Sequence, residues 1–321
     1  MLCGGSFPGR VLLQSSSFLC RSSAHKKATS AAVASFERRT MATASHYGAH
    51  SADSYEKAYF YEAGAYMQHL VDLVSNRLQL EQELEQRRIL DIGGGTGNFA
   101  QALVNNTCNT TEAIVVDPFL DPTSSIDPND RVKFVKEPAE AFLEPPRDNN
   151  DNDWWRKEYH QVLLKEIVHH LKEEDRVGIF RGMYQGLVPL PKKDDDAAAA
   201  PPPSLLIITR PQIDIDYPLW DAARTVWREN QPSAFDFQRE LKRAGFTDIS
   251  ATLEAYPCQI SLERWQSMVR QRFWSTFSNF SDDELNDACQ QIVQDYKDRT
   301  TEDGILHFED RLVFISARKA E

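Results

Sequence analysis

The sequence has few cysteines, and none of them forms a motif. Its 321 residues include five, which are scattered along the chain and never spaced as C-x-x-C. A disulfide framework requires a regular set of cysteines and a zinc knuckle requires paired ones, so neither is expected. This cysteine usage fits a reducing compartment. The five are Cys3, Cys20, Cys108, Cys258 and Cys289.

The sequence also lacks an excess of basic charge and a long apolar run. Its formal net charge is −12 and its isoelectric point is near 5.2. Because neutralising phosphates requires a basic face, this charge argues against a general nucleic-acid binder and favours a small-molecule substrate. The apolar run from Val11 to Leu13 is too short for a membrane span, so we expect no membrane association.

Basic charge is concentrated near the N-terminus. Up to about Ser45 the acidic side chain is that of Glu37 alone, while arginine, lysine, serine and alanine are frequent. The composition resembles that of an organelle transit peptide, so we expect a mitochondrial location, with the plastid as second choice. The alternative is a disordered tail, with translation starting at Met41 and a cytoplasmic protein. Under either interpretation of residues 1–45, we expect residues 46–321 to form one domain that is even more acidic than the whole chain.

The most informative segment reads ILDIGGGTGNFA and spans residues 89–100. Its apolar start predicts a buried strand, which Asp91 closes. Gly93, Gly95 and Gly97 then allow the backbone to turn tightly against a ligand before a helix begins. This arrangement is typical of a nucleotide-type binding turn.

A second apolar strand, predicted over residues 113–116, ends in Asp117. The carboxylate of Asp117 stands about 20 residues beyond the glycines, where it can accept both hydroxyls of a ribose. Together the two strands predict an adenosine-holding β-α-β unit. A dinucleotide site requires G-x-G-x-x-G or A, so that the helix packs close to the strand and faces a pyrophosphate, but Asn98 stands at the third glycine position.

The pattern Asp-x-Gly-x-Gly-x-Gly instead resembles motif I of the class I S-adenosylmethionine-dependent methyltransferases. The resemblance implies S-adenosylmethionine as the cofactor. One alternative is an NAD-linked oxidoreductase, which Asn98 and the lack of a Tyr-x-x-x-Lys pair disfavour. Another is a methyltransferase-like binding module without turnover. The residues implied to hold the cofactor at this turn are Asp91, Gly93, Gly95, Gly97 and Asp117.

Apolar strands alternate with helical patterns along the chain. They predict an α/β fold with a doubly wound, mostly parallel seven-stranded sheet whose final strand is antiparallel. Helices over 54–80 are expected to form a lid on the cofactor, or else to fill core with their aromatic side chains. A low-complexity surface loop is expected at 191–203. Predicted strands cover 88–92, 113–116, 132–135, 161–164, 204–209, 248–256 and 312–317, and later helices cover 220–229, 234–244, 261–280 and 282–299.

In such a sheet, ligands bind beyond the carboxyl ends of the strands. After the third strand the family usually has an acid followed by a small residue that meets the adenine edge. Here Pro138 stands where the acid is expected. Either Glu137 or Glu140 substitutes for it, or Ala139 acts through its backbone alone.

The chain after the fourth strand resembles the family's stretch at the methionine half of the cofactor. The resemblance implies backbone contacts from Leu164 and Lys165, followed by a helix that opens with His169 and His170. Either histidine, with a pKa near neutrality, can accept a proton from the acceptor; the alternative is that it caps or packs the helix. Adjacent helical side chains point about 100° apart and cannot chelate one ion, so we predict no metal.

Two helices between the last two strands predict a helical cap, residues 261–300, that roofs the substrate. Arg210, Arg270 and Arg272 can each pair with a carboxylate in a fork geometry, although surface ion pairing is the alternative. The organisation resembles small carboxylic-acid methyltransferases of the trans-aconitate and juvenile-hormone-acid type. It implies a small, carboxylate-bearing acceptor, methylated on O, N or S by in-line displacement. Trp220 and Trp274 complete the candidate substrate contacts.

Overall fold

The structure is a computed structural model that describes residues 65–80, 87–107, 111–119, 131–145, 151–190 and 201–320. The expected transit segment, residues 1–45, lies outside these ranges. So do residues 191–200 of the expected surface loop and residues 54–64 of the expected lid. Within the described ranges, no helix combines the length and the apolar character that crossing a membrane requires.

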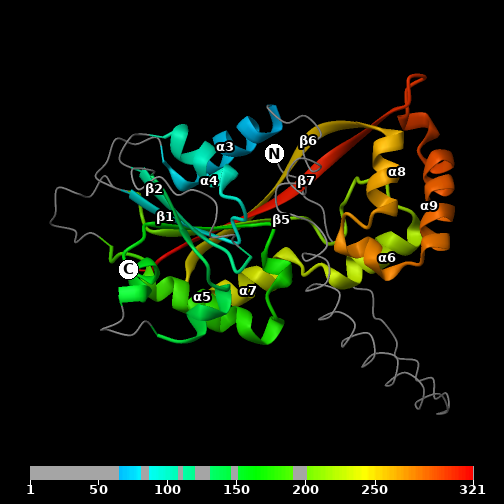
Figure 1. Ribbon diagram of the computed structural model, residues 1–321. Coiled ribbons are helices and arrows are strands. Elements are labelled where there is room, and N and C mark those ends of the chain that lie inside the picture. The colour runs from blue at the N-terminus through cyan, green and yellow to red at the C-terminus, as the bar shows by residue number, and fades with distance from the viewer. Residues whose placement is uncertain are drawn as a thin grey trace, which may run out of the picture. The chain divides into compact units, whose positions relative to one another are not determined.

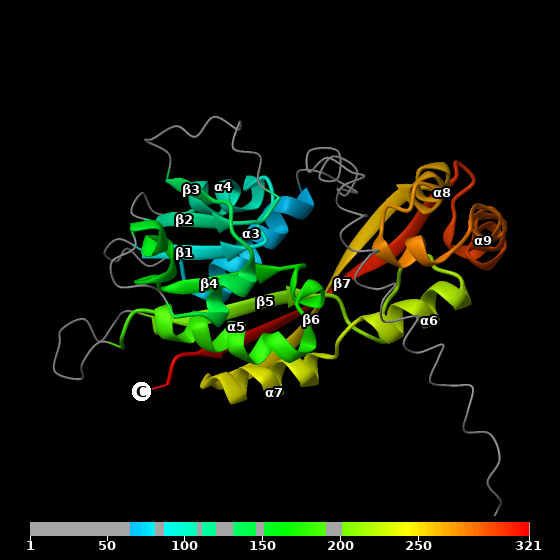
Figure 2. The ribbon, with the colours of Figure 1, turned by 60° about the horizontal axis from the view of Figure 1, so that its bottom comes forward.

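A sheet of seven strands organises the fold. Its order is β3-β2-β1-β4-β5-β7-β6 (Figure 2). Strands β1 to β5 are parallel, whereas β7 pairs antiparallel with both of its neighbours. The predicted doubly wound, mostly parallel seven-stranded sheet is confirmed. The strands are β1 (Arg87–Ile92), β2 (Thr111–Val116), β3 (Val132–Val135), β4 (Gln161–Lys165), β5 (Ser204–Thr209), β6 (Thr247–Ser261) and β7 (Ile305–Arg318).

Helices cover both faces of the sheet. On one face lie α3 (Ala65–Leu78) and α4 (Asn98–Asn105), and on the other lie α5 (Glu173–Gly186) and α7 (Ala234–Ala244) (Figure 1). A strand that is covered on both faces is apolar throughout rather than alternating. Accordingly, β5 is buried without interruption from Leu205 to Thr209.

Strands β6 and β7 extend beyond the sheet and carry a second hydrophobic core. Residues 305–312 of β7 pair with β6 and not with β5. This ribbon, together with α6 (Asp221–Asn230), α8 (Leu262–Arg270) and α9 (Asp282–Asp295), forms a unit that we call the cap (Figure 1). Trp265 is fully buried there, and its indole N–H donates to the Pro218 carbonyl at 2.9 Å. Other members of the cap core are Tyr217, Trp220, Trp227, Trp274, Phe277 and Phe308.

Several predicted boundaries differ from the observed ones. The last two strands are longer than 248–256 and 312–317, because each continues into the ribbon of the cap. The helix predicted over 261–280 ends at Arg270, since Arg272 adopts a left-handed φ of +53° and a separate 3-10 turn, η5 (Ser275–Asn279), follows. The helix predicted over 282–299 ends at Asp295.

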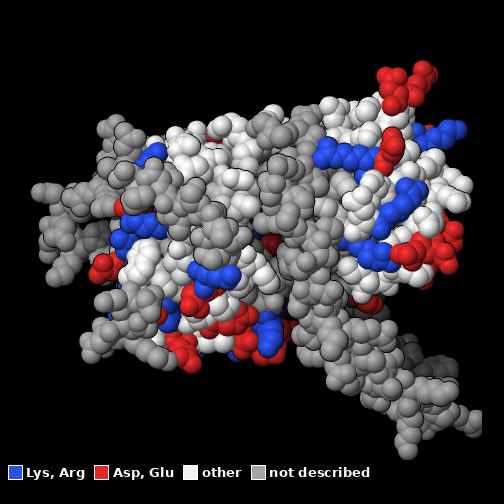
Figure 3. All heavy atoms as spheres, viewed as in Figure 1, with Lys and Arg blue, Asp and Glu red and all other residues white. Residues whose placement is uncertain are grey.

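Charged side chains of both signs share the surface. On the face shown in Figure 3, lysine and arginine are interspersed with aspartate and glutamate over the described residues. Some form exposed pairs, such as Arg239 with Asp236 at 2.7 Å. Exposed pairs of this kind contribute little to stability, because water and salt screen them.

A buried ion pair joins α5 to α7. Nη2 of Arg176 donates to Oε1 of Glu240 at 2.9 Å, and its Nε lies 2.9 Å from Oε2. Both side chains are buried. Burial raises the pKa of Glu240, whereas the hydrogen bond and charge of Arg176 lower it. The carboxylate therefore depends on the guanidinium for its compensation.

Arg176→Met should destabilise the protein by about 3–5 kcal/mol, because it leaves the Glu240 carboxylate buried without a counter-charge. The double variant Arg176→Met/Glu240→Met should regain most of that loss. Urea unfolding followed by circular dichroism measures both. The matched control is Arg239→Met in the exposed pair with Asp236, which should change the free energy of unfolding by less than about 1 kcal/mol. Equal losses at Arg176 and Arg239 would contradict the argument from burial.

Candidate functional site

Three glycines shape the turn between β1 and α4. Gly93, Gly95 and Gly97 have left-handed φ values of +71°, +57° and +79°. A Cβ on Gly93 would lie 2.3 Å from Cγ2 of Ile167, and one on Gly97 would lie 2.6 Å from the Phe134 ring. Among the described residues, a Cβ on Gly95 would have no atom within 4 Å. Packing therefore requires glycine at the outer two positions, whereas Gly95 faces open space.

The amides of this turn are hydrogen-bonded within the protein. The N–H groups of Gly93, Gly95 and Gly97 donate to the Val116 carbonyl at 2.7 Å, to Oδ2 of Asp117 at 3.1 Å and to the Gly94 carbonyl at 3.0 Å. A phosphate-binding turn directs such amides at the ligand instead. These three amides are therefore not directed at a ligand.

Asp117 follows β2 directly and is held beside the turn. Its Oδ2 accepts from Gly95, and its Oδ1 accepts the N–H of Phe119 at 2.8 Å. Two backbone donors thus fix the carboxylate next to the open space at Gly95. This is the position in which a ribose could meet it.

Asp91 is buried beneath the same turn. A Cβ on Gly94 would lie 2.5 Å from its Oδ2, and its Oδ1 has no hydrogen-bond partner among the described residues. Burial raises the pKa of Asp91 to about 7; the Lys165 ammonium lowers it, and the Asp117 carboxylate raises it further. A cationic ligand group at the turn would stabilise the ionised form of this buried carboxylate.

The end of β4 lies beside the end of β1. Leu164 is the register partner of Ile92, and the Lys165 ammonium lies 5.2 Å from the centroid of the Phe99 ring in α4. Ile167 packs on Gly93, as described above. The structure thus brings Leu164 and Lys165 to the glycine turn.

The residues after β3 divide between solvent and core. Glu137 is exposed, whereas Ala139 is buried at the start of the 3-10 turn η1 (Ala139–Leu143) and belongs to the core with Phe142. Pro138 precedes that turn. Of the three candidates for the adenine edge, Ala139 lies in the core, Glu140 is half-buried in η1, and Glu137 is exposed to water.

The histidine pair lies in a 3-10 turn, η3 (Val168–His170), rather than at the start of α5, which begins at Glu173. Here the ring centroids of His169 and His170 are 3.9 Å apart, in place of the wide separation expected on a helix. Burial lowers the pKa of His169 to about 4 instead of leaving it near neutrality. His169 is therefore neutral at pH 7 and a weak base. Among the described residues, no group of three or more potential ligands could hold a metal ion.

A cluster of ionisable side chains gathers at the carboxyl ends of β4 and β5. Glu166 forms an ion pair with Arg210, and the Nε of Arg210 donates to the hydroxyl of Tyr217. The hydroxyls of Tyr217 and Tyr66 donate to the two carboxylate oxygens of Asp310. Nη2 of Arg210 lies 3.6 Å from Asp310 as well. We call these five residues the Glu166 cluster.

Asp310 is not among the site residues predicted from the sequence. It lies in β7, ahead of the predicted strand 312–317. A signal is present, because Leu306, Phe308, Asp310 and Leu312 are all buried and share one face of the strand. Alternation over these residues would have extended the strand and identified a carboxylate at a core-facing position.

Two of the candidate arginines are engaged within the cap. The Nε of Arg270 donates to Oδ1 of Asn286 at 3.2 Å, and Arg272 pairs with Asp282 at 2.6 Å. Both contacts join the region of α8 to α9. The structure does not bring these two arginines to the glycine turn, and for Arg272 it shows the ion-pair alternative.

The two candidate tryptophans stack on Phe277. The ring centroids of Trp220 and Trp274 lie 5.9 Å and 5.6 Å from that of Phe277, with interplanar angles of 17° and 14°. Trp220 belongs to the cap core. Trp274 also borders the Glu166 cluster, since Cζ of Arg210 lies 5.9 Å from its ring centroid.

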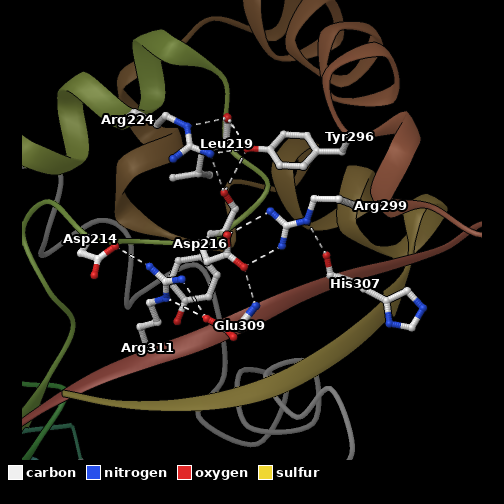
Figure 4. A network of polar contacts seen from close by, with 10 residues as sticks. Asp214, Asp216, Leu219, Arg224, Tyr296, Arg299, His307, Glu309 and Arg311 are labelled. Carbon is white, nitrogen blue, oxygen red and sulfur yellow. Dashed lines mark hydrogen bonds and ion pairs between the residues drawn. The ribbon is translucent and has the colours of Figure 1, made fainter.

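A further polar network holds the loop between β5 and α6 against β7 and the cap (Figure 4). Asp216 accepts two hydrogen bonds from Arg299, at 3.0 Å and 2.6 Å, and the N–H of Glu309 at 2.8 Å. Arg224 donates to the Tyr217 carbonyl at 3.2 Å. Because this loop carries Tyr217, the network also fixes one wall of the Glu166 cluster.

A hollow of about 380 Å³ lies at the opposite end of the sheet. It is lined by Ser204, which begins β5, and by Arg318, which ends β7. The glycine turn follows the carboxyl end of β1, so the hollow is separate from the candidate site. In a parallel sheet of this kind, ligands bind at the carboxyl ends.

No protein-family model matches this chain, and no curated protein matches it. Among solved structures, it is similar to phosphoethanolamine N-methyltransferase 2 of Haemonchus contortus, in complex with phosphomonomethylethanolamine and S-adenosylhomocysteine. The identity is 15%, the TM-score is 0.42, and the match covers 81% of this chain and 53% of that chain. This chain thus spans about half the length of the Haemonchus protein.

A second similar structure is a SAM-dependent methyltransferase from Archaeoglobus fulgidus. The identity is 15% and the TM-score is 0.44, over 79% of this chain and 94% of that chain. At these identities and scores, both likenesses concern the fold alone.

Asp91→Asn should change how stability depends on pH. Burial raises the pKa of Asp91 from 3.8 to about 7, so its contribution to stability is full below about pH 4 and is lost as the pH rises through 7. The melting temperature of the variant, relative to wild type, should therefore rise between about pH 5 and pH 8. Scanning calorimetry over this range measures the difference. The matched control is Asp72→Asn at an exposed position, whose melting temperature should differ from that of wild type by the same amount at every pH. A pH-independent difference for Asp91→Asn would contradict the assigned burial effect.

Proposed function

We propose that this protein is an S-adenosylmethionine-dependent methyltransferase that methylates a small acceptor by in-line displacement. One observation supports this most: Gly95 faces open space, and its own amide is held by the carboxylate that would meet the ribose. The fold supports the proposal as well, because the turn stands at the carboxyl ends of parallel strands.

The residues present fit this cofactor. Asp117 would hold the ribose hydroxyls, the backbone at Gly95 would lie along the adenosine, and Ala139 would border the adenine through its backbone. The buried Oδ1 of Asp91, which has no hydrogen-bond partner among the described residues, suits the cationic amino-acid end, beside Lys165. Bound S-adenosylmethionine supplies a methyl group activated by a sulfonium. The chain supplies binding and orientation, which accounts for most of the catalysis in such a reaction.

The cap would exclude water from the acceptor. Its core reaches the Glu166 cluster through Tyr217 and Trp274, whose ring centroids are 4.6 Å apart. An acceptor with a free lone pair needs no enzymatic base, and His169 is a weak one. A carboxylate on the acceptor would have to displace Glu166 from Arg210 in order to pair with that guanidinium. The carboxylate-bearing acceptor stays a prediction.

Gly95→Ala should weaken the binding of S-adenosylmethionine and S-adenosylhomocysteine at least tenfold, because the new methyl group enters the ligand's space. The matched control is Gly304→Ala, also at a left-handed φ (+76°) with no atom within 4 Å of the added Cβ. Both variants should lose about 1 kcal/mol of unfolding free energy, but only the first should lose affinity. Isothermal titration calorimetry measures the binding. Unchanged affinity in Gly95→Ala would contradict the assigned site.

The same titrations separate the alternatives. Wild type should bind S-adenosylmethionine and its product at micromolar concentrations and should not bind NAD. Tight binding of NAD would overturn the proposal in favour of an oxidoreductase. A turnover screen with radiolabelled methyl groups over amines, hydroxyls, thiols and carboxylates then identifies the acceptor. Cofactor binding without turnover of any acceptor would favour the binding-module alternative.

A further inference from the structure

The Glu166 cluster holds two carboxylates against one guanidinium. Asp310 is almost fully buried, and Arg210 is buried as well. Glu166 keeps 20% of its side chain exposed and forms the open end of the cluster. Lys165 also lowers the pKa of Glu166, and Asp91 lies at the same edge, so that three carboxylates face two cationic side chains among the described residues when all are ionised. In a site of low dielectric, such an excess of negative charge attracts a cation strongly.

The open end of the cluster lies next to the glycine turn. Ile167, which follows Glu166, packs on Gly93, and Lys165, which precedes it, also acts on Asp91. Glu166 adopts a left-handed φ of +61°, which is uncommon for a residue other than glycine and marks functional sites more often than others. The partnerless Oδ1 of Asp91 is an independent sign that this edge takes a cation.

Arg210 shows how a cation is accommodated here. Cζ of its guanidinium lies 5.4 Å from the ring centroid of Tyr217 and 5.9 Å from that of Trp274, while Glu166 and Asp310 lie on the polar side. Aromatic faces and carboxylates both favour positive charge. The surroundings therefore suit a second positive group at Glu166 better than an anion.

We infer that Glu166, supported by Asp310 and Arg210, forms a cation-selective subsite at the point of methyl transfer. The inference rests on the proposed function. In the reaction, an acceptor lone pair bonds to the methyl carbon while the carbon–sulfur bond breaks and its electron pair passes to sulfur. The sulfonium becomes a neutral thioether, so the subsite binds the cofactor in preference to its product. An amine acceptor keeps the positive charge near Glu166, whereas a carboxylate brings a repelled anion.

The ionisation of Glu166 sets the conditions of the test. Burial raises its pKa to about 8; the Asp310 carboxylate of β7 adds to the rise, and Lys165 of β4 lowers it. Arg210, which follows β5, forms the ion pair with Glu166, and the hydroxyl of Tyr66 on α3 donates to the same Asp310. The subsite is therefore most selective above about pH 8.

Calorimetry at about pH 8.5 should compare three ligands: S-adenosylmethionine, S-adenosylhomocysteine, and sinefungin, which carries an ammonium group at the sulfonium position. Glu166→Gln should weaken the two cationic ligands about tenfold and leave S-adenosylhomocysteine unchanged, which also shows that the variant is folded. The matched control is Glu112→Gln, which alters a carboxylate of similar exposure (18%) that pairs with Lys133 near the starts of β2 and β3, and it should change none of the three affinities.

Equal losses for all three ligands, or no loss for the cationic two, would overturn the inference. If Glu166→Gln does not fold, the wild-type protein alone tests the inference. Its affinity for S-adenosylmethionine relative to S-adenosylhomocysteine should rise between about pH 6.5 and pH 8.5. A ratio that does not change with pH would overturn the inference as well. Failure of wild type to bind any of the three ligands would instead refute the proposed function.

Discussion

The parallel pairing of β1 with β2 and β4 is the constraint on which the candidate site depends. Ile92 is in register with both Val116 and Leu164, so three strands end on one line. Parallel strands have their carboxyl ends at the same edge of the sheet, so the residues that follow the three strands lie close together. The glycine turn, Asp117 and Lys165 meet at this edge, although up to about 70 residues separate them in sequence. A slip of one residue in either pairing would turn Asp117 or Lys165 to the other face of the sheet.

The antiparallel ribbon of β6 and β7 contributes a second hydrophobic core and a buried carboxylate. Its length carries a second core away from the sheet, and its inward face brings Asp310 to the ends of β4 and β5. A carboxylate in such a place is stable only with partners, and it has two tyrosine hydroxyls and a guanidinium. These partners come from α3 and from the loop after β5. The buried acid therefore couples the cap, α3 and the sheet into one arrangement.

The predictable parts of the molecule are those whose signals are local. Apolar runs that end in glycine or aspartate located β1 and β2 to within a few residues, and with them Gly95 and Asp117. The Glu166 cluster was not predictable in this way, because its members are joined by contacts across up to 244 residues, as between Tyr66 and Asp310. Helical periodicity also continued through Arg272, where tertiary packing imposes a left-handed turn. Nothing local distinguishes an arginine that pairs with α9 from one that borders the site.

Carboxylates are frequent at this edge of the sheet. Asp91, Asp117 and Glu166 lie at or near the carboxyl ends of β1, β2 and β4, Asp310 lies beside them, and burial raises the pKa of both Asp91 and Glu166. The amides of Gly93, Gly95 and Gly97, which could have attracted an anion, are hydrogen-bonded within the protein. A pyrophosphate would meet these carboxylates, whereas a ligand with an ammonium and a sulfonium would relieve their unfavourable burial. The arrangement of charge therefore distinguishes between two cofactors that use the same backbone unit, which the fold alone does not.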